Sequence, residues 1–433
     1  MDGELLPVVD GMFDDLRSAV APVAAPLHAE GHCLYLVGGV VRDRLLGDDQ
    51  TPDYDLTTDA MPDRIRALVA GVADAVWLQG ERFGTIGLRI GNGNMEVTTH
   101  RSEAYVDESR KPVVRFSSDL IEDLARRDFT INAIAVDVAD GMLHDPFDGR
   151  TDLVNRTLRT PLDPAESFSD DPLRMLRAAR FLSRYGLTAV DGLVEAAILL
   201  ADRIGIVSRE RIRDELFRLL EVKDPTAGFA LLDNMRLLTL VLPEVAALQA
   251  STCKALNEQV AGAAPDPVLR LGVLAYGAGG GDTLGSWQST LRLSGRDVRR
   301  IGTLLDGVGL LTGMTGKAGV DASGPSFDEG LRRIAARSGK YFDEVLAFAK
   351  AVGVDPDGIE VGSAVSRLRA TGELDDLGPA LDGATVMRLL GLTAGPVVGE
   401  VMNWLSELRL REGNLDDDEV RRQLVEWWGA VDG

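Results

Sequence analysis

Asp53 and Asp55, separated by a single tyrosine, are the residues of this sequence best suited to hold a metal ion. Side chains alternate along a strand, so we expect both carboxylates on one face. Two carboxylates that point together need a cation between them. Mg²⁺ is the hard cation that prefers oxygen ligands and keeps phosphate oxygens in its shell. Without further context, a polar turn after a helix explains the same two acids, because Asp-rich turns are common.

A glycine pair and a third acid extend this group. The segment LVGGVVRDRLLG (36–47) predicts a strand that runs into Gly38 and Gly39 and then a helix. Such a turn brings bare backbone amides and a positive helix end to one point, which suits a triphosphate. Glu96, in the predicted strand NMEVTTHR, completes a set of three acids, as two-metal phosphoryl transfer requires. Taken alone, a solvent-facing strand glutamate is the better explanation of Glu96.

Two further segments carry clustered charges. In EDLARRDFTINAIAVD (122–137), paired arginines suit a phosphate, and Asp128 with Asn132 suits ribose hydroxyls. In SDDPLRMLRAARFLSRYG (169–186), the pattern predicts one helix that is capped near Asp170 or Asp171 and ends at Gly186. Its polar face is expected to expose Arg174, Arg177, Arg180 and Arg184. An ordinary i, i+4 surface salt bridge between Asp170 and Arg174 is the simpler explanation of that pair.

These residues must be positioned by a small mixed sheet and a long helical remainder. Alternating patterns predict strands over residues 34–40, 85–90, 94–99 and 133–138, with helices between them. After about residue 148 the strand signals fade and amphipathic helices take over. The predicted fold class is α+β, with an elongated all-helical neck, body and tail after the head. Glycine-rich stretches at 277–285 and 307–324 are expected to be loops.

Composition restricts the classes of protein that fit. Hydrophobic residues make up 45% of the 433 residues and charged residues 26%, which is typical of a globular protein with several packed units. The net charge of −22 argues against a protein that coats itself in nucleic acid, but permits binding through one basic face. Two unrelated cysteines, an acidic N-terminus and no long apolar run favour a cytoplasmic protein that does not enter a membrane.

Taken together, the charged segments resemble the family of class II CCA-adding tRNA nucleotidyltransferases and bacterial poly(A) polymerases, within the DNA polymerase β-like superfamily. The resemblance is strong from residue 34 to residue 220, and residues 397–428 are similar to the family's final helices. It is carried, in this order, by LVGGVVRD, DYD, EVTTHR, RRDFTINA, DDPLRMLRAARF and RERIRDEL. The resemblance implies an enzyme that adds C, C and A to the tRNA 3′ end from CTP and ATP by two-metal in-line transfer.

The resemblance also implies a role for individual residues. Asp53, Asp55 and Glu96 would be the catalytic acids and the ligands of Mg²⁺. The residues that would contact the nucleotide are Gly38, Gly39, Arg42, Arg127, Asp128, Asn132, Asp170, Asp171, Arg174 and Arg177. Within this set, the acid pair and Arg174 would act as a protein template that hydrogen-bonds the base edge. Asp170 departs from the family, which usually has glutamate there, and His100 stands where many relatives have an aromatic residue.

The family's organisation implies four parts. These are a catalytic head (25–148), a base-selecting neck (149–223), a helical body (224–330) and a tRNA-binding tail (331–433). Many relatives carry a metal-dependent phosphohydrolase module with a His-Asp pair, and LGVLAYGAGGG (271–281) resembles its sequence with Tyr and Gly in place of that pair. All four histidines precede residue 150, so a histidine-ligated metal site beyond it is ruled out. The implied partners are tRNA, CTP and ATP, with no protein partner.

Three alternatives remain open from the sequence. A poly(A) polymerase shares every motif, although such enzymes generally end in a basic extension and this chain ends in EVRRQLVEWWGAVDG. A partial enzyme that adds only CC or only A is the second alternative. CC-adding relatives tend to lack a flexible segment that residues 102–120 supply here. From a different class, an inactive RNA-binding module is disfavoured by the intact acids and glycines.

Overall fold

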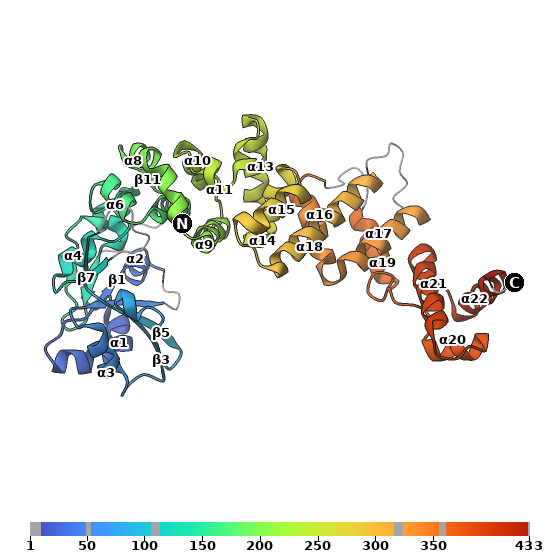
Figure 1. Ribbon diagram of the computed structural model, residues 1–433, viewed down its shortest axis with the longest axis horizontal. Coiled ribbons are helices and arrows are strands. Elements are labelled where there is room, and N and C mark those ends of the chain that lie inside the picture. The colour runs from blue at the N-terminus through green and yellow to red at the C-terminus, as the bar shows by residue number, and fades with distance from the viewer. Residues whose placement is uncertain (1–9, 49–52, 105–112, 316–323, 355–360, 432–433) are drawn as a thin grey trace. The chain divides into compact units, whose positions relative to one another are not determined.

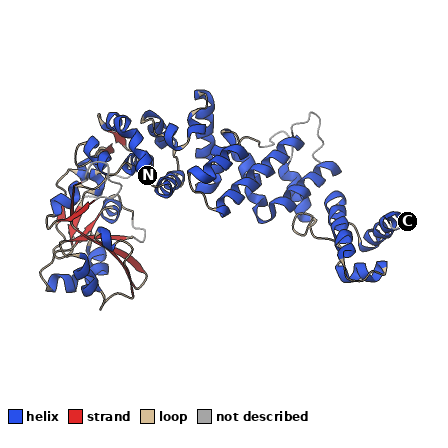
Figure 2. Cartoon of the chain, in the orientation of Figure 1, coloured by secondary structure: helices blue, strands red, loops and turns tan. Residues whose placement is uncertain are grey.

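The computed structural model describes residues 10–48, 53–104, 113–315, 324–354 and 361–431 (Figure 1). The chain divides into two compact units, Met1–Ala246 and Ala247–Gly433. All strands of the described residues belong to the first unit, and the second is built from helices (Figure 2). No helix in the described ranges is long and apolar enough to cross a membrane. The predicted α+β class, a mixed-sheet head with a mostly helical remainder, is confirmed.

A seven-stranded sheet in the order β3-β4-β5-β2-β1-β8-β9 forms the centre of the first unit. The β2–β5 pair is parallel and the other neighbouring pairs are antiparallel. Its strands are β1 (Tyr35–Val37), β2 (Tyr54–Thr58), β3 (Ala75–Trp77), β4 (Thr85–Ile90), β5 (Gly93–Thr99), β8 (Ala135–Asp137) and β9 (Leu143–His144). The sequence pattern located β1, β4, β5 and β8 and missed the short edge strands.

The two faces of this sheet differ in polarity. Leu56, Leu88 and Val97 are fully buried on one face, where α3 contacts β4 and β5 and also contacts α1. Alternation places Asp55 and Glu96 on the opposite face. The helical segments of this part are α1 (Asp14–Ala29), α2 (Gly39–Leu45), α3 (Pro62–Val69), η1 (Glu81–Phe83), α4 (Leu120–Ala125) and η2 (Thr130–Asn132).

A separate hairpin of β6 (Arg101–Ala104) and β7 (Val113–Phe116) follows the sheet, and α4 contacts it. The segment 102–120, which the sequence analysis expected to be flexible, lies partly outside the described residues, at 105–112.

The rest of the first unit is mostly helical, as predicted. Its elements are α5 (Gly149–Val154), β10 (Thr157–Leu158), α6 (Pro164–Asp170), α7 (Leu173–Tyr185), β11 (Thr188–Ala189), α8 (Leu193–Leu200), η3 (Ala201–Ile206), α9 (Arg209–Leu220), α10 (Thr226–Asn234), α11 (Leu238–Val241) and α12 (Pro243–Ala246). The short parallel pair of β10 with β11 was not predicted. Helix α7 lies at the centre of this part and contacts both α9 and α10.

The helix predicted within residues 169–186 is α7, which begins at Leu173, close to the predicted cap at Asp170 or Asp171. A second helix that was not predicted, α6, ends at Asp170. Asp171 between them is extended, with φ −140° and ψ 100°. The cause is Pro172, whose ring disfavours the helical conformation of the residue before it. Gly186 ends α7 in the left-handed conformation, as predicted.

The second unit contains helices α13 (Ala250–Gly262), α14 (Pro267–Gly277), α15 (Gly281–Thr290), α16 (Gly295–Thr315), α17 (Pro325–Ser338), η4 (Gly339–Tyr341), α18 (Phe342–Ala351), α19 (Val361–Ala370), α20 (Gly383–Leu390), α21 (Pro396–Glu412) and α22 (Asp417–Val431). The last three helices share a core built on Leu381, Val386, Val401, Leu405, Val420 and Leu424. The expectation of loops in the glycine-rich stretches is wrong for most of their described residues, because α15 and α16 run through them.

Candidate active site

The glycine pair lies where β1 ends and α2 begins. Gly38 has φ 72°, a left-handed conformation that favours glycine. A Cβ atom on Gly38 would lie 3.1 Å from Arg127 Nη1 and 3.4 Å from Asp55 Oδ2. The turn therefore brings the Gly38 backbone next to a cation and a carboxylate that the sequence had singled out separately.

The three acids line one wall of a cavity. Asp53 directly precedes β2, Asp55 is within it, and Glu96 is the register partner of Asp55 on β5. Burial raises the pKa of Asp55, and the charges of Glu96 and Asp53 raise it further against the opposing charge of Arg127. These acids therefore repel one another, which a bound cation would relieve. Among the described residues, no three His, Cys, Asp or Glu side chains already form a metal-holding cluster.

Arg127 is held beside the glycine turn by a residue that the sequence analysis missed. Its Nη2 atom lies 3.4 Å from Asp123 Oδ2. Asp123 is buried and also accepts hydrogen bonds of 3.2 Å from Thr57 Oγ1 and from the Arg101 backbone N–H. An aspartate four residues before a paired arginine, on the helical face, is the signal that points to this contact.

Arg42, Asn132 and Asp128 form a buried chain of hydrogen bonds instead of pointing into the cavity. Arg42 donates through Nη1 to Asn132 Oδ1 and through Nε to Asp43 Oδ1 at 2.8 Å. Asn132 Nδ2 donates to Asp128 Oδ1 at 2.8 Å. The Arg42 guanidinium also lies 4.6 Å from the centre of the Tyr185 ring, a cation–π contact with α7. The polar atoms of these three side chains are therefore engaged with protein partners, and none of the three lines the cavity.

Arg177 connects this chain to the helical part of the unit. Its Nε atom donates to Asp128 Oδ2 at 2.8 Å, and its side chain also lines the cavity. Burial alone would raise the pKa of Asp128. The charge of Arg177 and the hydrogen bonds from Asn132 and Arg177 outweigh burial and hold this pKa well below its usual value. The carboxylate is therefore ionised and fixes Arg177 at the cavity edge.

The expected base-reading residues lie around the break between α6 and α7. Arg174 does not extend into solvent: its Nη1 atom donates to Ser167 Oγ at 2.8 Å and its Nη2 atom to the Arg126 carbonyl. Asp171 accepts a 2.7 Å bond from Arg211 Nη2 through Oδ2 and a 3.1 Å bond from the Leu173 backbone N–H through Oδ1. Asp170 is the last residue of α6. These side chains lie outside the lining of the large cavity.

The expectation that the arginines of α7 are all exposed is wrong for Arg180. Its side chain is buried and donates through Nε to Glu215 on α9, itself buried. Burial lowers the pKa of Arg180, partly offset by the charge of Glu215. Phe181 lies under the guanidinium, 4.3 Å away. This arginine thus joins α7 to α9.

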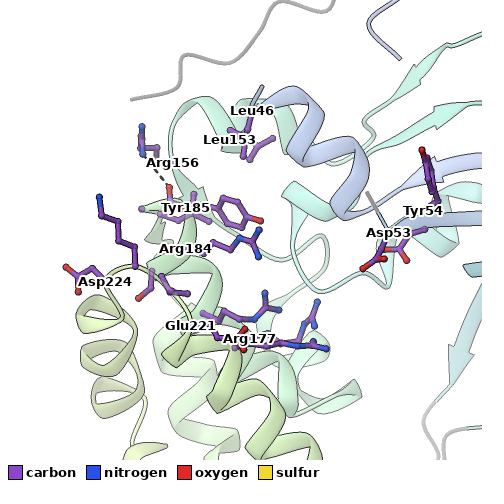
Figure 3. Close-up of a pocket in the computed structure, with 18 of the residues that line it drawn as sticks. Leu46, Asp53, Tyr54, Leu153, Arg156, Arg177, Arg184, Tyr185, Glu221 and Asp224 are labelled. Carbon is purple, nitrogen blue, oxygen red and sulfur yellow. Dashed lines mark hydrogen bonds between the residues drawn. The ribbon is translucent and has the colours of Figure 1, made fainter. Parts of the chain in front are cut away.

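The cavity has a volume of about 1740 Å³, with the three acids on one wall and a predominantly basic set of side chains, together with Glu221 and Asp224, on the other. Figure 3 shows Asp53 and Tyr54 on one side and Arg177, Arg184 and Tyr185 on the other. The basic lining residues are Arg156, Arg177, Arg180, Arg184, Arg218 and Lys223. The space therefore suits a ligand that carries negative charge along its length and presents one reactive phosphate to the acids. Three of the lining residues, Arg156, Lys223 and Trp77, lie outside the motifs that the sequence offered as candidates.

The first unit joins a mixed sheet, which presents three acids beside a glycine turn, to a helical segment, and this is the arrangement that the sequence predicted for a nucleotidyltransferase head. Residues 34–159 match the family described as "Poly A polymerase head domain". Residues 192–249 match the family described as "Probable RNA and SrmB- binding site of polymerase A". Two segments of the chain are thus similar to parts of poly(A) polymerases, and together they cover less than half of its length.

Curated proteins named CCA-adding enzyme match part of the chain. The CCA-adding enzyme of Oceanobacillus iheyensis is 40% identical over 202 residues, which cover 46% of this chain and 49% of the relative. That of Staphylococcus aureus strain bovine RF122 is 42% identical over 210 residues, 48% of this chain and 51% of the relative. The chain thus spans about half the length of the curated relatives it matches.

Solved structures are similar over almost the whole chain. The crystal structure of the Bacillus stearothermophilus CCA-adding enzyme in complex with CTP has a TM-score of 0.72 at 26% identity, covering 98% of this chain and 99% of that one. The Thermotoga maritima CCA-adding enzyme complexed with tRNA_CCA has a TM-score of 0.66 at 19% identity, covering 97% and 96%. The latter likeness concerns the fold alone.

Proposed function

We propose that this protein adds C, C and A to the 3′ end of tRNA, using CTP and ATP. One observation carries the proposal: three acids and an arginine-rich helical wall line one cavity in a chain that is similar in fold to a CTP-bound CCA-adding enzyme. In this reaction the tRNA 3′-hydroxyl attacks the α-phosphorus of the nucleotide, and pyrophosphate leaves.

Asp53, Asp55 and Glu96 would hold divalent cations, with Mg²⁺ as the best match to their oxygen donors. The fit rests on the pairing of Asp55 with Glu96 across β2 and β5, and on the raised pKa of Asp55, to which burial contributes most and the charges of Glu96 and Asp53 add. Bound cations would activate the hydroxyl and stabilise the leaving phosphates. Gly38 and Gly39 would admit the triphosphate close to the backbone, and Arg127, held by Asp123, would contact its oxygens.

Asp128, Asn132 and Arg42 act in this proposal through Arg177 and Tyr185, because their own polar atoms are engaged with one another. Arg177 would contact the nucleotide from the cavity edge. Asp171 and Arg174 keep unused hydrogen-bonding capacity: besides its bonds to Ser167 and to the Arg126 carbonyl, Arg174 retains N–H groups at Nη2 and Nε. They would read the base, with Asp170 at their side.

The division of labour follows the same proposal. Residues 25–148 would catalyse and 149–223 would select the base. Residues 224–330 and 331–433 would hold the tRNA elbow and acceptor stem by their backbone shape. A cytoplasmic location fits the tRNA substrate.

The test uses tRNA transcripts that end at the discriminator base, at C and at CC, each incubated with one labelled nucleotide at a time. CCA addition predicts CTP incorporation on the first two and ATP incorporation on the third, then arrest. Long A tails would instead identify a poly(A) polymerase. Addition of CC without A, or of A alone, would identify a partial enzyme, and tRNA binding without any incorporation would indicate an inactive RNA-binding module.

A further inference from the structure

Trp77 occupies the same row of the sheet as the catalytic acids. It pairs with Gly87 on β4, Gly87 pairs with Glu96 on β5, and Glu96 pairs with Asp55 on β2. Residues paired directly across neighbouring strands point to the same face of a sheet. The indole is therefore on the face that carries the acids.

Gly87 allows the indole to lie against the sheet. A Cβ atom on Gly87 would come within 3.0 Å of Trp77 Cδ1 and Nε1 and 3.4 Å of Cε2. The ring therefore covers the bare backbone of Gly87, next to Glu96. Trp77 nevertheless remains 40% exposed and lines the large cavity. An aromatic ring that rests on the backbone with an open surface toward the site is a platform for stacking.

The strand order decides which substrate this platform meets. β1, which leads into the glycine turn, lies on one side of β2, whereas β5, β4 and β3 follow on the other side. The triphosphate is assigned to the glycine turn, and in-line displacement places the attacking hydroxyl opposite the leaving phosphates. The acceptor strand therefore approaches from the side of Glu96 and Trp77.

We propose that Trp77 stacks a base of the single-stranded RNA 3′ end whose hydroxyl is to be extended. The inference rests on the proposed function and adds the site that positions the acceptor. Unpaired RNA bases are commonly bound on aromatic rings beside cations. Arg89, on the same face two residues beyond Gly87 and exposed, is the cation adjacent to this platform, and its register partner Asn94 also lines the cavity.

The kinetic test compares Trp77→Ala, Trp77→Phe and the control Val76→Ala. Val76 neighbours Trp77 on the same strand, points to the other face and is 36% exposed. With tRNA ending in CC, Trp77→Ala should raise KM for the tRNA about fivefold or more, the loss expected for one stacked base. KM for ATP should stay unchanged, Trp77→Phe should recover most of the loss, and Val76→Ala should resemble the wild type. An unchanged KM for tRNA, or a rise confined to KM for ATP, would overturn the proposal.

A second measurement does not depend on activity. The full chain contains five tryptophans, so labelling with 5-fluorotryptophan gives a small set of ¹⁹F resonances in which Trp77→Phe identifies that of Trp77. Adding a short single-stranded RNA ending in ACC should shift this resonance, and a double-stranded RNA with blunt ends should not. An unmoved resonance at saturating RNA refutes the stacking site. A shift in a protein that incorporates no nucleotide would refute the proposed function and leave the RNA site supported.

Discussion

At the scale of single residues, the proposed phosphate-handling site depends on the arrangement around Asp55. A backbone without a side chain at Gly38, a cation at Arg127 and two further acids surround one partly buried carboxylate. Burial and like charge both oppose ionisation of Asp55, so the arrangement is costly unless a cation or a cationic ligand shares it. Such a cost is a common sign of a functional site.

Replacing Asp53 or Asp55 by alanine should abolish nucleotide addition and leave tRNA binding largely intact. These acids would hold cations rather than RNA, and loss of such a ligand costs several kcal/mol of transition-state stabilisation, or more than about a thousandfold in rate. Filter binding and primer extension on the same preparations measure the two effects. Asp63→Ala, at an exposed acid in the first turn of α3, is the matched control. Extension by either active-site variant within about tenfold of wild type would contradict the assignment.

Asp171 and Arg174 are the residues proposed to select the base of the incoming nucleotide. Removing Asp171 or Arg174 should blur discrimination among CTP, ATP, UTP and GTP more than it slows transfer, because each hydrogen bond to a base edge is worth about 1 to 3 kcal/mol of selectivity. The measurement is kcat/KM for all four nucleotides on tRNA ending in the discriminator base and in CC. Arg211→Ala removes the partner of Asp171 and serves as the comparison. Melting temperatures show whether each variant folds. If folded variants keep the wild-type ratios of kcat/KM among the four nucleotides, Asp171 and Arg174 do not select the base and serve only their local structural contacts.

At the scale of elements, one ion pair joins helix α7 to the head and another joins it to α9. Arg177 reaches Asp128, and Arg180 reaches Glu215. Because these charges are largely buried, removing one partner leaves the other uncompensated. The link therefore fixes where the basic wall of the cavity stands relative to the acids.

Asp128→Asn should destabilise the protein by about 3 kcal/mol near neutral pH, as expected when a buried pair loses one charge. The pKa of Asp128 is depressed in the folded state. The contribution of ionised Asp128 to the free energy of unfolding is thus fully present above the unfolded-state pKa of about 3.9. It is lost as the pH falls below that value toward the pKa of the folded state. Urea unfolding at pH 7 and at pH 3 measures the difference, with Asp63→Asn as the control. An equal deficit of the variant at both pH values would show that the charge of Asp128 is not responsible.

The element scale also shows what a sequence pattern can predict. The charged motifs and the alternating strands β4 and β5 were readable because their signals are local. The burial of Arg180 depends on tertiary packing, which overrides a surface-like arginine pattern. Gly307 was expected to lie in a loop because the stretch around it is rich in glycine. It lies in α16 instead, where a Cβ atom would come 2.5 Å from Val345. There glycine permits close helix packing instead of ending the helix.

At the scale of the whole molecule, a net charge of −22 requires that any RNA contact be local. In the first unit, the basic lining of the cavity meets this requirement. In the second unit, Arg300 is paired with Asp266 at 2.9 Å and with Glu344 at 2.7 Å. That arginine stabilises the helices of its own unit, so its charge is already compensated.

The second unit should show no phosphohydrolase activity. Tyr276 and Gly277 stand where related modules have a His-Asp pair, and no histidine follows residue 144. Tyr276 packs edge-on against Phe348 with ring centres 6.2 Å apart, and a Cβ atom on Gly277 would lie 2.7 Å from Leu256. Apolar contacts thus occupy the position that metal ligands would need.

Hydrolysis of 2′,3′-cyclic phosphates and of phosphomonoesters is the measurement, in the presence of Ni²⁺, Mn²⁺ or Mg²⁺. We expect background rates, because histidine is a principal ligand for such transition metals and the second unit has none. The variant Tyr276→His with Gly277→Asp should also remain inactive, because the new aspartate would clash with Leu256 and the other ligands would still be missing. Metal-dependent turnover that persists in Asp53→Ala would contradict the prediction, because it could not arise from the acids of the first unit.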